Sequence, residues 1–213
     1  MIRHHLSDDL LTGYCAGSLP EAFNVLIATH VSLCDECRAR LASLEALGGA
    51  LLESAGPVAM DNGALAATLA RIMGQPPMPW TAPARPKGLF PEPLRARVGG
   101  DLDAVRWRPV GGGVRQAILP TSGRASLRLL HIPGGGAVPD HGHKGTELTL
   151  VLQGAFRDES DRFGPGDVEI ADAEVHHTPV AEAGPACICL AATDAPLRFK
   201  GLVPRLVQPF VKI

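Results

Sequence analysis

The segment from Gln75 to Pro93 constrains the fold of this chain most, because it contains seven prolines and few apolar residues. Such a composition favours an extended, semi-rigid chain over packed structure. The hydrophobic period also changes across this segment, from 3.6 before it to 2 from about residue 100 onward. A chain of 213 residues is long enough for one large domain or two modest ones. We therefore predict an α + β protein with domains at 1–74 and 98–213, joined by a linker at 75–97.

The first domain carries helix start signals and apolar residues at helical spacing. Ser7 and the two aspartates after it suit a helix start, since a hydroxyl caps free amide groups and carboxylates favour the positive end of the helix. The run Ser18-Leu-Pro-Glu21 predicts a capping box for the next helix. Four helices are predicted: from Ser7, from Ser18 to about His30, from Leu33 or Cys34 onward, and from Asp61 or Asn62 to Met73. Gly48-Gly49 is expected to weaken or end the third helix. The apolar stripe of the fourth helix either completes this small bundle or lies in a groove of a partner.

A metal-binding pattern lies between the second and third of these helices. His30, Cys34 and Cys37 follow one another as His-x3-Cys-x2-Cys, which supplies three of the four ligands of a closed tetrahedral zinc site. We expect His5 to be the fourth ligand, in preference to His4, because it is closer to the start of the first helix. The alternative is two buried thiols beside a surface histidine. A structural zinc at this point would help to stabilise so small a bundle.

Composition excludes several classes of function. The net charge of −2 and the nine aromatic residues give neither a positive field nor stacking surfaces for nucleic acid. Few basic residues in the first domain also argue against a DNA-binding zinc module. No apolar run approaches the roughly 20 residues of a membrane span. An odd cysteine count and a metal-type spacing favour the reducing cytoplasm, and Cys15 is expected to be a buried core thiol.

From about residue 100, short runs of β-branched and apolar residues alternate with Gly and Pro. This pattern predicts a β-sandwich or barrel. The expected strands are Ala104–Trp107, Val114–Leu119, Leu127–Ile132, Leu148–Leu152, Val168–Ile170, Cys187–Ala191 and Leu206–Val211.

A second set of metal-ligand residues lies within these strands. His141 and His143 are two residues apart and face the same way on an extended chain, and Glu147 returns after a short turn. His177 follows the turn at Gly166-Asp167. Three imidazoles and one carboxylate suit zinc, manganese, iron or nickel. Left unpaired inside a barrel, such side chains would be costly, which favours a metal there.

These residues resemble the first conserved motif of the cupin superfamily, which runs Gly135-x5-His141-x-His143-x3-Glu147-x6-Gly154 here. The second cupin motif is degraded: Gly166, Asp167 and His177 match, but the usual Pro-x-Gly is replaced by Asp172-Ala-Glu174 and the usual Asn by Val180. The resemblance implies a jelly-roll barrel with a metal site.

Two further features of the strands bear on this site. His176 is expected to face away from His177, although a slip of one residue would exchange them. Cys187 and Cys189 point to one face of a strand and are either small core residues or, if exposed, thiols open to oxidation.

The combination of the His/Cys helical domain with a cupin resembles the ChrR family of zinc-binding anti-sigma factors over nearly the whole chain. The resemblance implies that His5, His30, Cys34 and Cys37 bind zinc, and that the cupin binds a second divalent metal. It also implies a one-to-one complex with an extracytoplasmic-function (group IV) sigma factor. Release on singlet oxygen or organic peroxide stress, with the cupin domain as sensor, would follow. The competing hypothesis is a metal-dependent cupin enzyme, such as a dioxygenase or isomerase, with an accessory zinc module.

Overall fold

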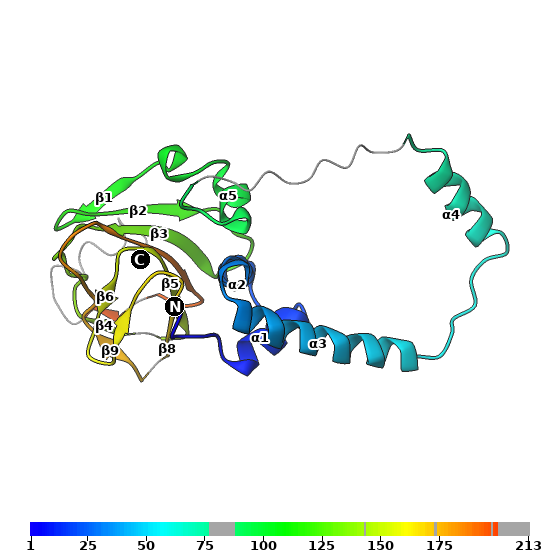
Figure 1. Ribbon diagram of the computed structural model, residues 1–213, viewed down its shortest axis with the longest axis horizontal. Coiled ribbons are helices and arrows are strands. Elements are labelled where there is room, and N and C mark those ends of the chain that lie inside the picture. Colours follow the sequence, from blue (N-terminus) through cyan, green and yellow to red (C-terminus); the bar gives the residue numbers. More distant parts are fainter. Residues whose placement is uncertain (77–87, 143, 173, 197, 200–213) are drawn as a thin grey trace.

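The computed structural model describes residues 1–76, 88–142, 144–172, 174–196 and 198–199. Antiparallel strands form a rounded body, and helices cover one of its faces (Figure 1). The helices are α1 (Asp8–Cys15), α2 (Glu21–Leu33), α3 (Asp35–Ser54), α4 (Ala64–Met73) and α5 (Glu92–Val98), with a 3-10 turn at Leu102–Ala104. The strands are β1 (Arg108–Gly111), β2 (Val114–Leu119), β3 (Ser126–Ile132), β4 (His141–Gly142), β5 (Glu147–Gln153), β6 (Phe156–Arg157), β7 (Arg162–Phe163), β8 (Val168–Ala171), β9 (His176–His177), β10 (Val180–Ala181), β11 (Cys187–Thr193) and β12 (Arg198–Phe199).

Local sequence explains how the first helices begin. The Ser7 hydroxyl caps α1 by accepting a hydrogen bond from the amide of Leu10. The capping box predicted for α2 does not form, because Ser18 bonds back to Gly13 and Pro20 occupies the cap position. The Glu21 carboxylate instead accepts a bond from the amide of Ser122 in the strand region. Glu21, which was predicted to cap its own helix, therefore contributes to the contact between the helical half and the strand region.

The third helix continues past the two glycines that we expect to weaken or end it. It runs through Gly48-Gly49 to Ser54. Two interior glycines cost about 1 kcal/mol each relative to alanine, and the Leu, Ala and Glu residues around them are strong helix formers. Of the two expected outcomes, an end of the helix at the glycines is therefore excluded.

Six strands form the main sheet, in the order β1-β2-β3-β11-β5-β8. Two three-stranded sheets, β10-β6-β7 and β12-β4-β9, complete the body. Side chains of β5 alternate between the two faces of the main sheet, as the period of 2 requires. Leu148 and Leu150 join the core under the helices, whereas Val151 joins a second core inside the body. Both faces of this strand are buried.

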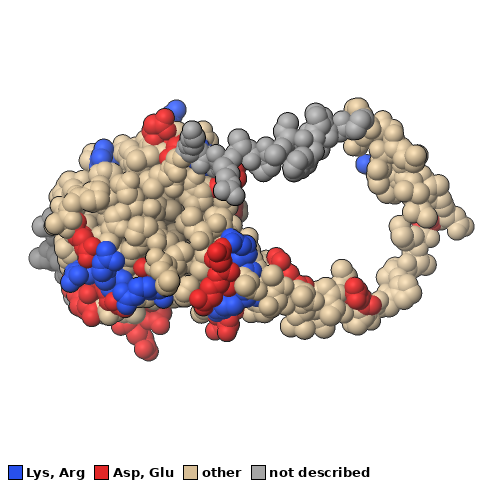
Figure 2. Space-filling model, in the orientation of Figure 1, with Lys and Arg blue, Asp and Glu red and all other residues tan. Residues whose placement is uncertain are grey.

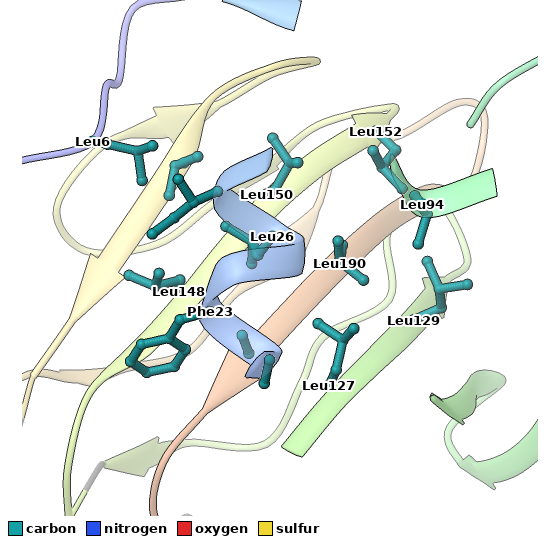
Figure 3. Packing of buried hydrophobic residues seen from close by; sticks show 14 of the residues in the cluster. Leu6, Phe23, Leu26, Leu94, Leu127, Leu129, Leu148, Leu150, Leu152 and Leu190 are labelled. Carbon is teal, nitrogen blue, oxygen red and sulfur yellow. The ribbon is translucent and has the colours of Figure 1, made fainter. Parts of the chain in front are cut away.

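The helices and the main sheet share one core (Figure 3). Phe23 and Leu26 of α2 lie over Leu127, Leu148 and Leu190 of three neighbouring strands. All five side chains are at most 4% exposed. Burying one such side chain contributes about 1.5–3 kcal/mol. We had expected the helices to form a small core of their own, and that expectation was wrong because their apolar faces pack on the sheet.

The end of the predicted linker is folded. Phe90 and Leu94 are buried, and α5 packs beside α2. The predicted strand at Ala104–Trp107 is also wrong, since Ala104 ends a 3-10 turn and the first strand begins only at Arg108. Most of the linker, residues 77–87, and the predicted strand at Leu206–Val211 lie outside the described residues.

An arm leaves the body at the C-terminal half of α3 and continues through α4 (Figure 1). No residue of α4, all of which is described, is buried, so this helix does not complete a bundle. On the face seen in Figure 2, charged side chains are scattered along the arm and most of its surface is uncharged. Its exposed large apolar residues are Leu47, Leu51, Leu52, Val58, Met60, Leu65, Leu69, Ile72 and Met73. Within the described ranges, no helix combines the length and apolarity that a membrane span requires.

Candidate metal sites

Four side chains predicted as zinc ligands meet at the junction of the N-terminal helices. His5, His30, Cys34 and Cys37 each offer one ligand atom, and these atoms all lie within 4.8 Å of one another. The His5 Nδ1 atom is 3.2 Å from the Cys34 sulfur and 3.7 Å from the Cys37 sulfur. Ligands about 2.0–2.3 Å from one tetrahedral zinc lie roughly 3.3–3.8 Å apart. The spacing therefore fits a single ion held by two thiolates and two imidazoles.

The chain brings the cysteines together by ending one helix and starting the next. Cys34 is the residue between α2 and α3, in an extended conformation, and its sulfur accepts a hydrogen bond from the Cys37 amide. Cys37 lies one turn into α3, and both thiols are buried. Burial, together with the neighbouring Cys34, raises the pKa of the Cys37 thiol. Cys37 is therefore a protonated thiol at neutral pH until a cation replaces the proton.

His30 is oriented by the opposite half of the molecule. Its Nδ1 atom donates a hydrogen bond of 3.0 Å to the carbonyl oxygen of Gly166, in the turn before β8. That bond places the free lone pair on Nε2, which is buried without a hydrogen-bond partner. Burial lowers the pKa of His30 to about 4, so the ring is neutral. A buried, unpartnered Nε2 aimed at two thiols has the chemistry of a metal ligand.

The structure separates the two candidate histidines at the N-terminus. The Nε2 atom of His5 is 3.3 Å from Glu36, which leaves Nδ1 facing the thiols. His4 instead lies beside Phe163, with its Nε2 3.1 Å from Asp161. Cys15 is exposed at the end of α1, so the expectation of a buried core thiol was wrong.

Inside the body, two of the predicted cupin ligands face each other. The Nε2 atoms of His141 and His177 are 3.2 Å apart. The Nδ1 atom of His141 donates to the carbonyl of Pro139, and that of His177 meets carboxylates. The pKa of His177 is raised to about 9, so its ring carries both protons at neutral pH and its Nε2 atom can donate to the Nε2 atom of the neutral His141. A metal ion bound by both Nε2 atoms would take the place of that proton.

The remaining predicted cupin ligands are only partly placed. Glu147 is buried at the start of β5, on the inner face, and burial raises the pKa of its carboxyl group. His143 lies outside the described residues. His177 is buried and His176 is exposed, so the register is the one expected and the two have not exchanged roles.

Two carboxylates near His177 were missed by the sequence analysis. Its Nδ1 atom is 2.7 Å from Glu169 on β8 and 3.0 Å from Asp158 in the loop after β6. Burial lowers the pKa of a histidine, but these two partners outweigh it and raise the pKa of His177. Glu169 could have been found, because it interrupts the apolar run Val168–Ala171 at an inward position. No sequence signal identifies Asp158.

Cys187 and Cys189 point to one face of β11, as expected, with their sulfurs 3.5 Å apart. Both thiols are buried in the inner core, next to residues such as Val151 and Phe156. Hydrogen bonding to Cys187, together with burial, raises the pKa of Cys189 well above that of a free thiol. Neither thiol is exposed to solvent in this conformation.

Comparison with known proteins identifies the family. The domain described as the ChrR cupin-like domain matches residues 95–195. The anti-sigma-E factor ChrR of Cereibacter sphaeroides is 64% identical over 215 aligned residues, which cover 100% of this chain and 99% of that protein.

One solved structure agrees with this result. A chain from the crystal structure of Rhodobacter sphaeroides SigE in complex with the anti-sigma ChrR is 61% identical, with a TM-score of 0.82. The match covers 91% of the present chain and 100% of that one. An RmlC-like cupin protein from Ralstonia eutropha is 24% identical, with a TM-score of 0.42 over 48% of this chain and 71% of its own. Because it is 64% identical over its whole length to the anti-sigma-E factor ChrR, the chain belongs to the ChrR family of anti-sigma factors, and its cupin-like domain follows an N-terminal helical region.

Proposed function

We propose that this protein is an anti-sigma factor that binds one extracytoplasmic-function sigma factor and keeps it from RNA polymerase. The observation that carries the proposal is the 64% identity over the whole chain to an anti-sigma-E factor. The solved relative was crystallised with SigE, which makes a sigma factor of that type the partner to test first. Because such a partner acts on RNA polymerase, the proposed place of action is the cytoplasm.

The arm supports this proposal and suggests where the partner binds. Nine large apolar side chains are exposed between Leu47 and Met73, far from the shared core. Exposed apolar patches of this kind mark protein interaction sites. On α4, Leu65, Leu69 and Ile72 lie on one stripe, as in amphipathic helices that fill a partner's groove. On binding, the partner would bury this stripe, and the stripe would cover an apolar groove of the partner.

Substitutions on opposite faces of α4 test the proposal. Leu69→Asp with Ile72→Asp should abolish the complex with the cognate sigma factor, measured by size exclusion and by transcription from a sigma-dependent promoter. Ala67→Asp adds a charge to the other face and should leave both readouts within about twofold of the unmodified protein. Neither change should reduce thermal stability, since every residue involved is exposed. An intact complex with both apolar residues replaced would refute this binding surface.

We further propose zinc at the His5, His30, Cys34 and Cys37 site. Four protein ligands close the coordination sphere, so the role of that ion would be structural. A second divalent metal, zinc or else manganese, iron or nickel, is proposed at His141, His143, Glu147 and His177. An ion at the second site would supply open coordination positions. Native mass spectrometry in chelator-free buffer should count two metals per chain.

The cupin site is the proposed sensor of oxidative stress such as singlet oxygen or organic peroxide. Its support is the buried pair His141 and His177, whose Nε2 atoms are 3.2 Å apart inside the barrel. His141→Ala should leave the sigma factor inhibited in unstressed cells and abolish its release when singlet oxygen is generated. Full induction in cells that carry His141→Ala would refute the sensor role while leaving the inhibitor role intact. Cys187→Ser and Cys189→Ser, tested with organic peroxide, would show whether these buried thiols take part.

A further inference from the structure

We propose that strand β8 and the turn before it, Gly164–Asp167, couple the two metal sites, and that Glu169 and Asp167 are the positioning residues of this coupling. The inference deepens the proposed function, because it gives the route from the sensing domain to the helical half. It rests on contacts of β8 and of this turn with the proposed ligand residues, which metal coordination alone would not require.

The first contact lies at the zinc-site end of the turn. The carbonyl of Gly166 fixes the ring of His30, and with it the Nε2 atom that faces the thiols. The buried Asp167 carboxylate accepts bonds from the backbone amides of Arg3, at 2.6 Å, and His4, at 3.0 Å. One turn therefore holds His30 directly and His5 through the adjoining N-terminal segment.

The turn has little freedom to move independently of that segment. Gly166 has a φ of +91°, and a side chain there would approach Ile2 to 2.6 Å. The amide of Val168 donates to the carbonyl of His4, so the N-terminal segment lies along the free edge of β8. A shift of β8 would displace residues 2–5 as well.

The second contact is made by Glu169 of β8, three residues after Gly166. Val168 belongs to the core shared by the helices and the main sheet, whereas Glu169 points inward and meets His177 at 2.7 Å. Carboxylates bonded to the outer nitrogen of a metal-ligating histidine set the orientation of its ring. Glu169 therefore positions His177 as Gly166 positions His30. An open pocket of about 420 Å³ beside the strand is lined by both His5 and Glu169.

Cobalt in place of both metals provides the first test. The thiolate-to-cobalt absorption band arises only at the site with cysteine ligands, so its decay under EDTA reports the loss of that ion alone. With the cupin site emptied by His141→Ala, we expect the decay to be at least about fivefold faster, the lower end of known couplings. Glu169→Ala should reduce that ratio toward one. Glu174→Ala, at an exposed position after the same strand, should leave the ratio unchanged.

Hydrogen exchange on the unmodified protein gives a test that no folding defect can obscure. The first equivalent of zinc should fill the cysteine site and the second the cupin site. The second equivalent should slow exchange at the amides of Gly166, Asp167 and Val168. The coupling would be overturned if the cobalt absorption band decayed at the same rate with the cupin site full or empty. It would also be overturned if the second equivalent of zinc slowed exchange only in the barrel around His141 and His177. Neither readout involves the sigma factor. If the two metal sites were coupled but the protein formed no complex with a sigma factor, only the proposed function would be overturned.

Discussion

His30 joins the two halves of the molecule through its two ring nitrogens. One nitrogen is bonded to Gly166 in the strand region, and the other faces Cys34 and Cys37. The local motif could be predicted from sequence, because three ligands lie within eight residues. The partner of the outer nitrogen could not, since it lies 136 residues away and contributes only a backbone carbonyl.

The two neighbouring histidines at the N-terminus give a matched test of the zinc site. His5→Ala removes a ligand atom and should weaken zinc binding by more than about 100-fold, measured by competition with a chromogenic chelator. His4→Ala removes contacts to acidic residues and to Phe163, none of which is a proposed zinc ligand, and should leave the zinc affinity within a few-fold. Equal zinc affinity in the two variants would contradict the assignment of His5.

Proton release on zinc binding tests the protonation of the ligands. Because burial lowers the pKa of His30 to about 4, its ring is already neutral at pH 7 and gives up no proton. The pKa of Cys37 is raised, so this thiol is protonated at pH 7 and loses its proton to bind zinc. Calorimetry in buffers of different ionisation enthalpy should show at least one proton released per zinc, with affinity falling as the pH is lowered. No proton release would mean that Cys37 does not bind as a thiolate.

At the scale of elements, α2 connects the helical half to the sheet. Leu26→Ala should lower the free energy of unfolding by about 2–5 kcal/mol, since its side chain is fully buried against the sheet. Leu33→Ala, at the exposed end of the same helix, should cost less than about 1 kcal/mol. Urea unfolding of the two variants makes the comparison. A similar small loss in both would mean that α2 does not pack on the sheet in solution.

Strands were predicted better than helix ends. The run Val114–Leu119 forms β2 with the predicted bounds, because a short, mainly apolar run between glycine and proline has the length and flanking residues of a strand. The end of α3 was missed, since helix propensity around Gly48-Gly49 outweighed the cost of the glycines. The packing of α2 on the strands could not be read from periodicity, because an apolar helix face does not say which surface covers it. For the same reason, the sequence did not distinguish whether the apolar stripe of α4 completes the helical bundle or lies in a groove of a partner.

At the scale of the whole molecule, the shared core predicts one cooperative unfolding transition for the helices α1 and α2 together with the main sheet. Two domains that each had their own core would unfold in two steps. Calorimetry of the metal-loaded protein should therefore show a single main transition. Helical and sheet signals in circular dichroism should share its midpoint. Separate midpoints would contradict the common core.

Zinc should raise the midpoint of that transition for the whole chain, because its site lies where α1, α2 and α3 meet the turn before β8. Free zinc at 1,000 times its dissociation constant stabilises the folded state by about 4 kcal/mol. For a chain of this size, that corresponds to a shift of roughly 8–16 °C. His5→Ala should abolish most of the shift. Because the sheet shares its core with α2, the strand signal should move with the helical signal, and a shift of the helical signal alone would mean that the zinc site stabilises only the N-terminal half.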